Sequence, residues 1–165
     1  MPTVRRIVPG PGQESAWDYP RPPRLEPVSR RLRVIFAGRT VVDTSSAWRV
    51  LETSHPPVYY IEASAVAGAT LRSATGSSFC EFKGRAIYYD LVSGEHISRN
   101  AAWSYPAPSR AFEAIAHHLA FYPSRVDACY VDDERVTPQA GDFYGGWATS
   151  DIVGPFKGGP GTVGW

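Results

Sequence analysis

A thiol and an amine stand three residues apart, at Cys80 and Lys83, inside a stretch rich in aromatic residues. A neighbouring ammonium lowers the pKa of a thiol and raises its thiolate fraction, which nucleophilic or redox chemistry requires. In a straight strand, however, Cys80 and Lys83 point to opposite faces of the sheet. Only an irregularity near Gly84 would bring the thiol and the amine together. A buried structural cysteine is therefore the favoured interpretation of Cys80, and a nucleophile assisted by Lys83 is the alternative.

Lys83 also lies near aromatic residues that are suited to the walls of a pocket. Strand alternation places Trp103 and Tyr105 on one face of their strand. An amine beside such walls can receive an anionic ligand group, or it can pair with Glu52 or Glu62. The predicted ligand-binding residues are Glu52, Tyr60, Lys83, Tyr89, Trp103 and Tyr105. In the alternative interpretation the tyrosines belong to a sheet core and only their hydroxyl groups reach water.

The spacing of histidine and cysteine does not indicate a metal site. His117 and His118 are consecutive, so a helix would point their rings in different directions, and His55 and His96 are isolated. The two cysteines form no CxxC pair, and a site assembled from His55 and Glu52 is the weaker alternative. The sequence has no phosphate-binding loop, dinucleotide fingerprint or nucleophile elbow. We therefore expect neither a metal nor a cofactor.

Composition indicates one globular domain. The chain has 165 residues and 18.1 kDa, of which 43% are hydrophobic and 13% aromatic. A net charge of +1 does not favour nucleic acid as a partner, and no apolar run reaches the length of a membrane span. The N-terminal arginines are not followed by the apolar stretch of a secretory signal. With only two unpaired cysteines, we expect a cytoplasmic protein with reduced thiols.

Short apolar runs and turn signals alternate from Arg31 onward, at intervals of about eight to twelve residues. This pattern predicts an all-β body. One segment, from Ser109 to about His117, has apolar residues at helical spacing after a residue suited to an N-cap. Its continuation, residues 119–122, is equally compatible with a strand. We therefore predict a mainly β domain with one short helix.

Two special segments flank this body, which spans residues 30–138. Residues 1–29 form a proline-rich arm, which we expect to lie across the body or across a second copy of the chain in a homodimer. Residues 139–165 form a glycine-rich tail with interleaved aromatic residues. Aromatic side chains are unfavourable in a solvated linker, so we expect the tail to be ordered and packed on the domain.

Several motifs resemble a bacterial family known as domain of unknown function 427. They include Pro57-Val58-Tyr59-Tyr60-Ile61, Cys80-Glu81-Phe82-Lys83-Gly84, Tyr88-Tyr89-Asp90 and Ala101-Ala102-Trp103-Ser104-Tyr105-Pro106, in a match from about residue 33 to 122. Longer members have a similar arm and tail. One departure is Glu81, where many shorter members have proline.

The resemblance implies an antiparallel β-tent domain, similar to zinc-binding guanine-exchange chaperones (Mss4-like) and methionine sulfoxide reductase B. Those relatives often hold zinc with two CxxC pairs, which are absent here, so the resemblance implies no zinc site. A nucleotidyltransferase-like label attached to the family ranks low, because no paired metal-binding carboxylates occupy adjacent strand positions.

Function is therefore expected to reside in a small-molecule pocket. Trp103, Tyr105 and Tyr60 would supply its walls, Lys83 a charged contact and Glu52 an acceptor. One alternative is an enzyme in which Lys83 or Cys80 is the nucleophile and Glu52 or a tyrosine transfers protons. The other is an interaction module whose arm and tail wrap a partner.

Overall fold

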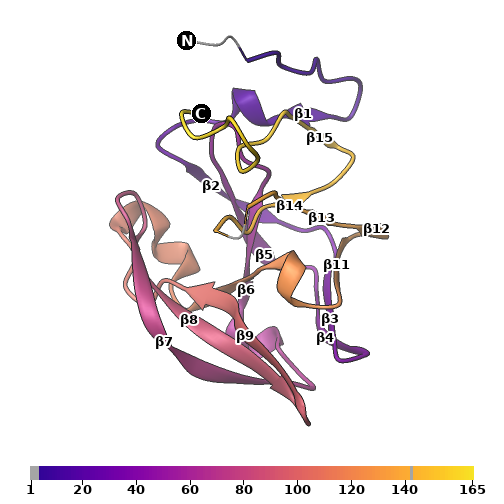
Figure 1. Cartoon of the computed structure of the whole chain (residues 1–165), viewed down its shortest axis with the longest axis vertical. Coiled ribbons are helices and arrows are strands. Elements are labelled where there is room, and N and C mark those ends of the chain that lie inside the picture. Colours follow the sequence, from indigo (N-terminus) through magenta and orange to yellow (C-terminus); the bar gives the residue numbers. More distant parts are fainter. Residues whose placement is uncertain (1–3, 142) are drawn as a thin grey trace.

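The computed structural model describes residues 4–141 and 143–165. Its largest element is a seven-stranded antiparallel sheet in the order β2-β5-β6-β10-β9-β8-β7 (Figure 1). The strands are β2 (Arg24–Val28), β5 (Ala47–Leu51), β6 (Val58–Glu62), β7 (Thr70–Cys80), β8 (Gly84–Ser93), β9 (His96–Ser104) and β10 (His118–Phe121). The predicted fold class, mainly β with antiparallel sheets, is confirmed.

A second antiparallel sheet supplies the other half of the main core. It has the order β12-β11-β3-β4, formed by β12 (Glu134–Arg135), β11 (Ala128–Val131), β3 (Leu32–Phe36) and β4 (Arg39–Thr44). Leu32 and Val34 alternate with partly exposed residues and are fully buried. They belong to the same core as Tyr59, Ile61 and Phe121 of the large sheet. Each such apolar side chain stabilises the fold by about 1.5–3 kcal/mol through burial.

The large sheet has a second buried face that carries the site described below. On β6, Tyr60 alternates with Tyr59 and Ile61, and it packs with Trp103 and Tyr105 in a separate cluster. The short η3 helix contributes Phe112 to this cluster. Period-two alternation therefore gives the sheet one face for the main core and one aromatic face.

The predicted helix is a short 3-10 helix, η3 (Arg110–Ile115), with a non-helical residue at Phe112. β10 begins at His118, so for residues 119–121 the structure has the strand alternative, while Tyr122 lies just beyond the strand. Three further 3-10 turns are η1 (Ala16–Asp18), η2 (Ala63–Ala65) and η4 (Pro123–Arg125). Among the described residues, no helix has the length and hydropathy needed to cross a membrane.

The arm and the tail pair with each other. β1 (Glu14–Ser15) in the arm runs parallel to β15 (Ile152–Val153) in the tail, and both described chain ends lie on one side of the molecule (Figure 1). Within the C-terminal part, β13 (Thr137–Pro138) pairs with β14 (Trp147–Ala148). Residues 1–3 of the predicted arm and 142 of the predicted tail lie outside the described residues.

The end of the predicted arm belongs to the large sheet. β2 pairs with β5 along its whole length, and it includes Pro27. Proline is tolerated there because β2 is an edge strand, whose outer side needs no ladder hydrogen bonds. The sheet therefore begins at Arg24 rather than near residue 30.

Candidate ligand-binding site

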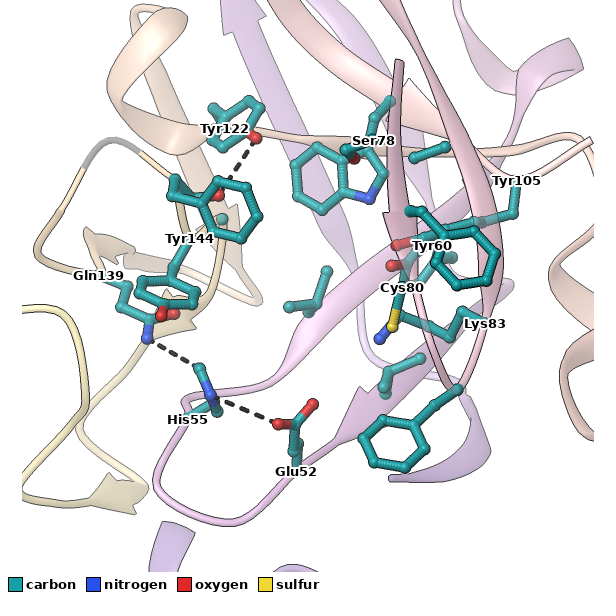
Figure 2. A pocket seen from close by; sticks show the side chains of 18 of the residues that line it. Glu52, His55, Tyr60, Ser78, Cys80, Lys83, Tyr105, Tyr122, Gln139 and Tyr144 are labelled. Carbon is teal, nitrogen blue, oxygen red and sulfur yellow. Dashed lines mark hydrogen bonds and ion pairs between the residues drawn. The ribbon is translucent and has the colours of Figure 1, made fainter. Parts of the chain in front are cut away.

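A cavity of about 310 Å³ lies on the aromatic face of the large sheet. Strands β5 to β9, the turns after β5 and β7, Tyr105, Tyr122 and the tail all contribute to its walls (Figure 2). The cavity therefore combines segments that lie far apart in the sequence, from residue 50 to residue 157.

Aromatic side chains form the central wall. The Tyr60 ring lies 6.4 Å from the Trp103 ring in an edge-to-face arrangement, and 6.3 Å from the Tyr105 ring. Trp103 also contacts Tyr122, with ring centroids 4.6 Å apart. Burial raises the pKa of Tyr60 and Tyr105, and it raises the pKa of Tyr122 to about 12. All three phenols are therefore neutral at pH 7 and offer flat apolar surface to a ligand.

The turn between β7 and β8 positions Lys83. It spans Glu81–Lys83, where the sequence is compatible with one continuous strand. Gly84 follows with φ +106°, a conformation that glycine adopts without strain. The Ser109 N–H donates to the Lys83 carbonyl (3.1 Å), and the Ser109 hydroxyl donates to the Phe82 carbonyl (2.6 Å). Ser109, the residue preceding η3, therefore stabilises this turn.

Lys83 is buried but has no acceptor for its charge. Its side chain lines the cavity and the residue is only 9% exposed. The amine lies 5.9 Å from the Tyr105 ring centroid and 6.0 Å from that of Phe112. No described residue forms a hydrogen bond or ion pair with the Lys83 amine, so the predicted pairing with Glu52 or Glu62 is not made. An ammonium group that lines a cavity and has no protein acceptor can pair with an anionic group of a ligand.

Cys80 lines the same cavity as Lys83. It is the last residue of β7 and is half-buried, whereas Cys129 is fully buried in the main core. The turn, rather than a bulge within a strand, brings the thiol and the amine to one side. A straight-strand interpretation would have separated them.

Glu52 and His55 form a second polar cluster of the cavity. The His55 Nε2 atom lies 3.6 Å from Glu52 Oε2, and an Arg21 guanidinium nitrogen lies 3.4 Å from the same oxygen. The Gln139 side-chain amide donates to His55 Nδ1 (3.0 Å) and to the Lys157 carbonyl (2.7 Å). Because Nδ1 accepts a hydrogen bond, the ring proton resides on Nε2, which faces Glu52 (Figure 2).

The arm and the tail hold the turn that carries this cluster. The Ser54 N–H donates to the Ala16 carbonyl (3.0 Å), and the Lys157 N–H donates to the Ser54 carbonyl (2.8 Å). Ser54 itself is fully buried with φ +72°, an unfavourable conformation for a residue other than glycine. Such a conformation persists only where the surroundings enforce it. The arm and tail therefore help to position Glu52 and His55.

The environment of His55 lowers its pKa below the ordinary value of 6.5. Burial is the largest cause; the Glu52 carboxylate opposes it, while Lys157 and Arg21 reinforce it. His55 is therefore neutral at pH 7.

We expect this histidine to make the folded protein less stable in mild acid. As the pH falls below 6.5, the unfolded chain binds a proton at this residue that the folded chain binds only at lower pH, so the free energy of unfolding decreases. Above pH 6.5 the contribution of neutral His55 to the free energy of unfolding is fully present and no longer changes with pH. Urea unfolding between about pH 7.5 and pH 5.5 should show a smaller decrease for His55→Gln than for the wild type. Replacement of the exposed His96 by Gln is the control, and equal pH dependence of His55→Gln and the wild type would contradict the expectation.

The tail closes one side of the cavity. The Tyr144 ring lies 5.0 Å from the His55 ring, and the Tyr122 hydroxyl donates to the Phe143 carbonyl (3.2 Å). Gly145 lies directly against Trp103, because a Cβ at this glycine would be 2.2 Å from the indole. Only glycine permits this close approach of the tail backbone to the aromatic wall.

Five of the six predicted binding residues line the cavity, and Tyr89 does not. Tyr88 lines it instead. The pairing of β8 with β9 sets Tyr88 opposite Trp103, and directly opposed residues share a face. Tyr89 lies opposite Ala102 and packs against the main core. The register between these strands, which sequence alternation alone does not give, therefore corrects this assignment.

A protein-family model described as "Domain of unknown function (DUF427)" matches residues 24–132, more than half of the chain. The chain belongs to this family. A search of curated proteins finds no match. The DUF427 match begins at the first residue of β2, which agrees with the start of the large sheet.

Part of the site lies outside the DUF427 match. Gln139, Tyr144, Gly145 and Lys157 all line the cavity and follow residue 132. Neither residue spacing nor strand alternation indicated that these residues or His55 belong to the pocket. The only sequence signal for them was the aromatic and glycine content of the tail, which predicted order but no particular contact.

Metal binding finds no support in the part of the DUF427 protein that the structure describes. No group of three or more histidine, cysteine, aspartate or glutamate residues there is arranged to hold a metal ion.

Proposed function

We propose that this DUF427 protein binds a small organic anion with a flat apolar body. The observation that carries the proposal is the Lys83 amine, which belongs to a residue only 9% exposed, lines the cavity and has no acceptor among the described residues. Tyr60, Trp103 and Tyr105 would contact the apolar body of the ligand. The cavity volume of about 310 Å³ falls at the lower end of the range for small-molecule sites.

Thermal unfolding with three carboxylates, benzoate, 3-phenylpropionate and 4-methylpentanoate, tests this proposal. A ligand at one hundred times its Kd stabilises the folded state by about 2.7 kcal/mol. We expect at least one of the three to raise the Tm of the wild type and to have no such effect on Lys83→Met.

Lys157→Met is the matched control for this test. Lys157 is the only other lysine and lines the same cavity, but its amine already donates to the Trp165 carbonyl oxygen (3.2 Å). We expect this variant to keep its response to the carboxylate. If no carboxylate raises the Tm, or if Lys83→Met responds as the wild type does, the proposed function is wrong.

A second candidate function, catalysis by a nucleophilic cysteine, is favoured by the position of Cys80 beside Lys83 in the cavity. The Cys80 thiolate would displace iodide from iodoacetamide, and Lys83 supplies a positive charge on the same cavity wall. In the folded protein we expect Cys80 to react faster than a free cysteine in solution. Burial raises the pKa of Cys129, which should not react. Peptide mass spectrometry after timed alkylation measures both rates, and a Cys80 as slow as Cys129 would remove it as a nucleophile.

A further inference from the structure

Glu52 is a second charged group in the cavity whose hydrogen-bonding capacity is unused. Its carboxylate accepts no hydrogen bond from any described residue. The closest approaches of Arg21 and His55 are both to Oε2, at 3.4 and 3.6 Å, and the side chain is 24% exposed. A carboxylate can accept about four hydrogen bonds, so Glu52 retains acceptor capacity toward the cavity.

Neighbouring residues leave the negative charge of Glu52 only partly compensated. His55 is neutral at pH 7, because burial lowers its pKa. The Arg21 side chain is 37% exposed and donates to the Thr53 carbonyl (2.8 Å), so water screens its attraction to Glu52. A cationic hydrogen-bond donor on a ligand in the cavity could therefore pair with the Glu52 carboxylate.

The charged side chains of the cavity wall balance among the residues that the structure describes. Two carboxylates, Glu52 and Glu81, and two amines, Lys83 and Lys157, line it there. Lys157 donates to a backbone oxygen, and Glu81 is exposed at the turn. The Lys83 amine and the Glu52 carboxylate remain, on separate elements and without an ion pair between them (Figure 2).

We propose that the ligand is a zwitterion of the amino-acid class, with its carboxylate at Lys83, its ammonium at Glu52 and an apolar side chain on the Tyr60–Trp103 wall. This inference rests on the proposed function and specifies the ligand's second charge. A simple anion satisfies Lys83 but leaves Glu52 without a donor. A zwitterion satisfies both groups and brings no net charge into the cavity.

The test compares three probes that differ only in their charged groups. Phenylalanine carries both charges, 3-phenylpropionate lacks the ammonium and phenethylamine lacks the carboxylate. An aliphatic series of leucine, 4-methylpentanoate and isopentylamine repeats the comparison with a different side chain. Titration calorimetry on the full chain should show at least one amino acid binding about tenfold or more tighter than both of its analogues, as expected for one charge-assisted hydrogen bond.

Two glutamate variants assign the ammonium contact. In Glu52→Gln, the advantage of the amino acid over its des-amino analogue should disappear, while affinity for the des-amino carboxylate stays within about twofold of the wild type. Glu81→Gln is the matched control, because Glu81 lines the same cavity but is exposed, and it should keep the advantage.

The outcomes separate this inference from the proposed function. If a carboxylate binds through Lys83 but the amino acid binds no tighter, or if Glu52→Gln retains the advantage, the zwitterion is wrong and the anion site stands. If none of the six probes binds, both proposals fail. If an amino acid binds and loses its advantage only in Glu52→Gln, both stand.

Discussion

Lys83→Met is expected to produce a protein that is more stable than the wild type when no ligand is present. The Lys83 residue is only 9% exposed, and no described residue accepts a hydrogen bond from its ammonium group. An unsatisfied buried polar group costs about 1–3 kcal/mol. The amine is not fully shielded from solvent and lies 5.9 and 6.0 Å from the Tyr105 and Phe112 rings, so we expect a cost near the lower end of this range. Methionine fills a similar volume without a charge. For a chain of this length the gain corresponds to a rise in Tm of about 2–4 °C per kcal/mol, measurable by calorimetry.

The control for this prediction is Lys157→Met. The Lys157 amine has a backbone acceptor, which the Lys83 amine lacks, so its loss should leave Tm unchanged or lower it. A fall in Tm for Lys83→Met similar to that of the control would mean that Lys83 stabilises the folded state. In that case its burial would not be evidence for a ligand. A rise in Tm together with loss of carboxylate binding is the trade-off expected of a functional residue.

Strand alternation predicted the parts of the site that depend on neighbouring residues in sequence. Trp103 and Tyr105 do share one face of the large sheet, and Tyr60 joins them. These assignments needed only the period of two along a single strand. The mainly β fold class followed from the same pattern.

The parts of the site that could not be predicted from the sequence depend on contacts between distant segments. Tyr88 rather than Tyr89 faces the cavity because of the register between β8 and β9. Lys83 and Cys80 line one cavity because residues 81–83 turn instead of continuing a strand. His55 obtains its orientation from Gln139, which lies 84 residues further along the chain. No local pattern encodes such contacts, since each requires the folded arrangement.

The helix prediction shows the same limit on a smaller scale. Apolar spacing after Ser109 predicted a helix as far as about His117, but the backbone leaves helical geometry at Phe112 and the next residues enter β10. His118 and Leu119 pair with β6 between two strands of the large sheet. The hydrogen bonds available from both neighbouring strands outweigh the weak helical preference of this segment.

Trp147→Ala is expected to destabilise the protein by about 3–5 kcal/mol, as found for large aromatic residues in cores. Trp147 is fully buried, and its indole N–H donates to the Phe121 carbonyl (3.0 Å). Its ring lies 5.1 Å from that of Tyr59 in the main core. Trp147 belongs to the tail, beyond the DUF427 match, so this prediction tests whether the tail is part of the folded unit. Urea denaturation of the full chain measures the change in the free energy of unfolding.

Two matched variants identify the cause of the destabilisation expected for Trp147→Ala. Phe143→Ala removes a tail aromatic that is 68% exposed and should change stability by less than about 0.5 kcal/mol. Trp147→Phe retains an aromatic ring but removes the indole donor, so it should lie between the wild type and Trp147→Ala. A small effect of Trp147→Ala would mean that the tail can detach without unfolding the sheets. The tail supplies Gln139, Tyr144 and Gly145 to the cavity, so a large effect would instead tie the integrity of the site to the stability of the core.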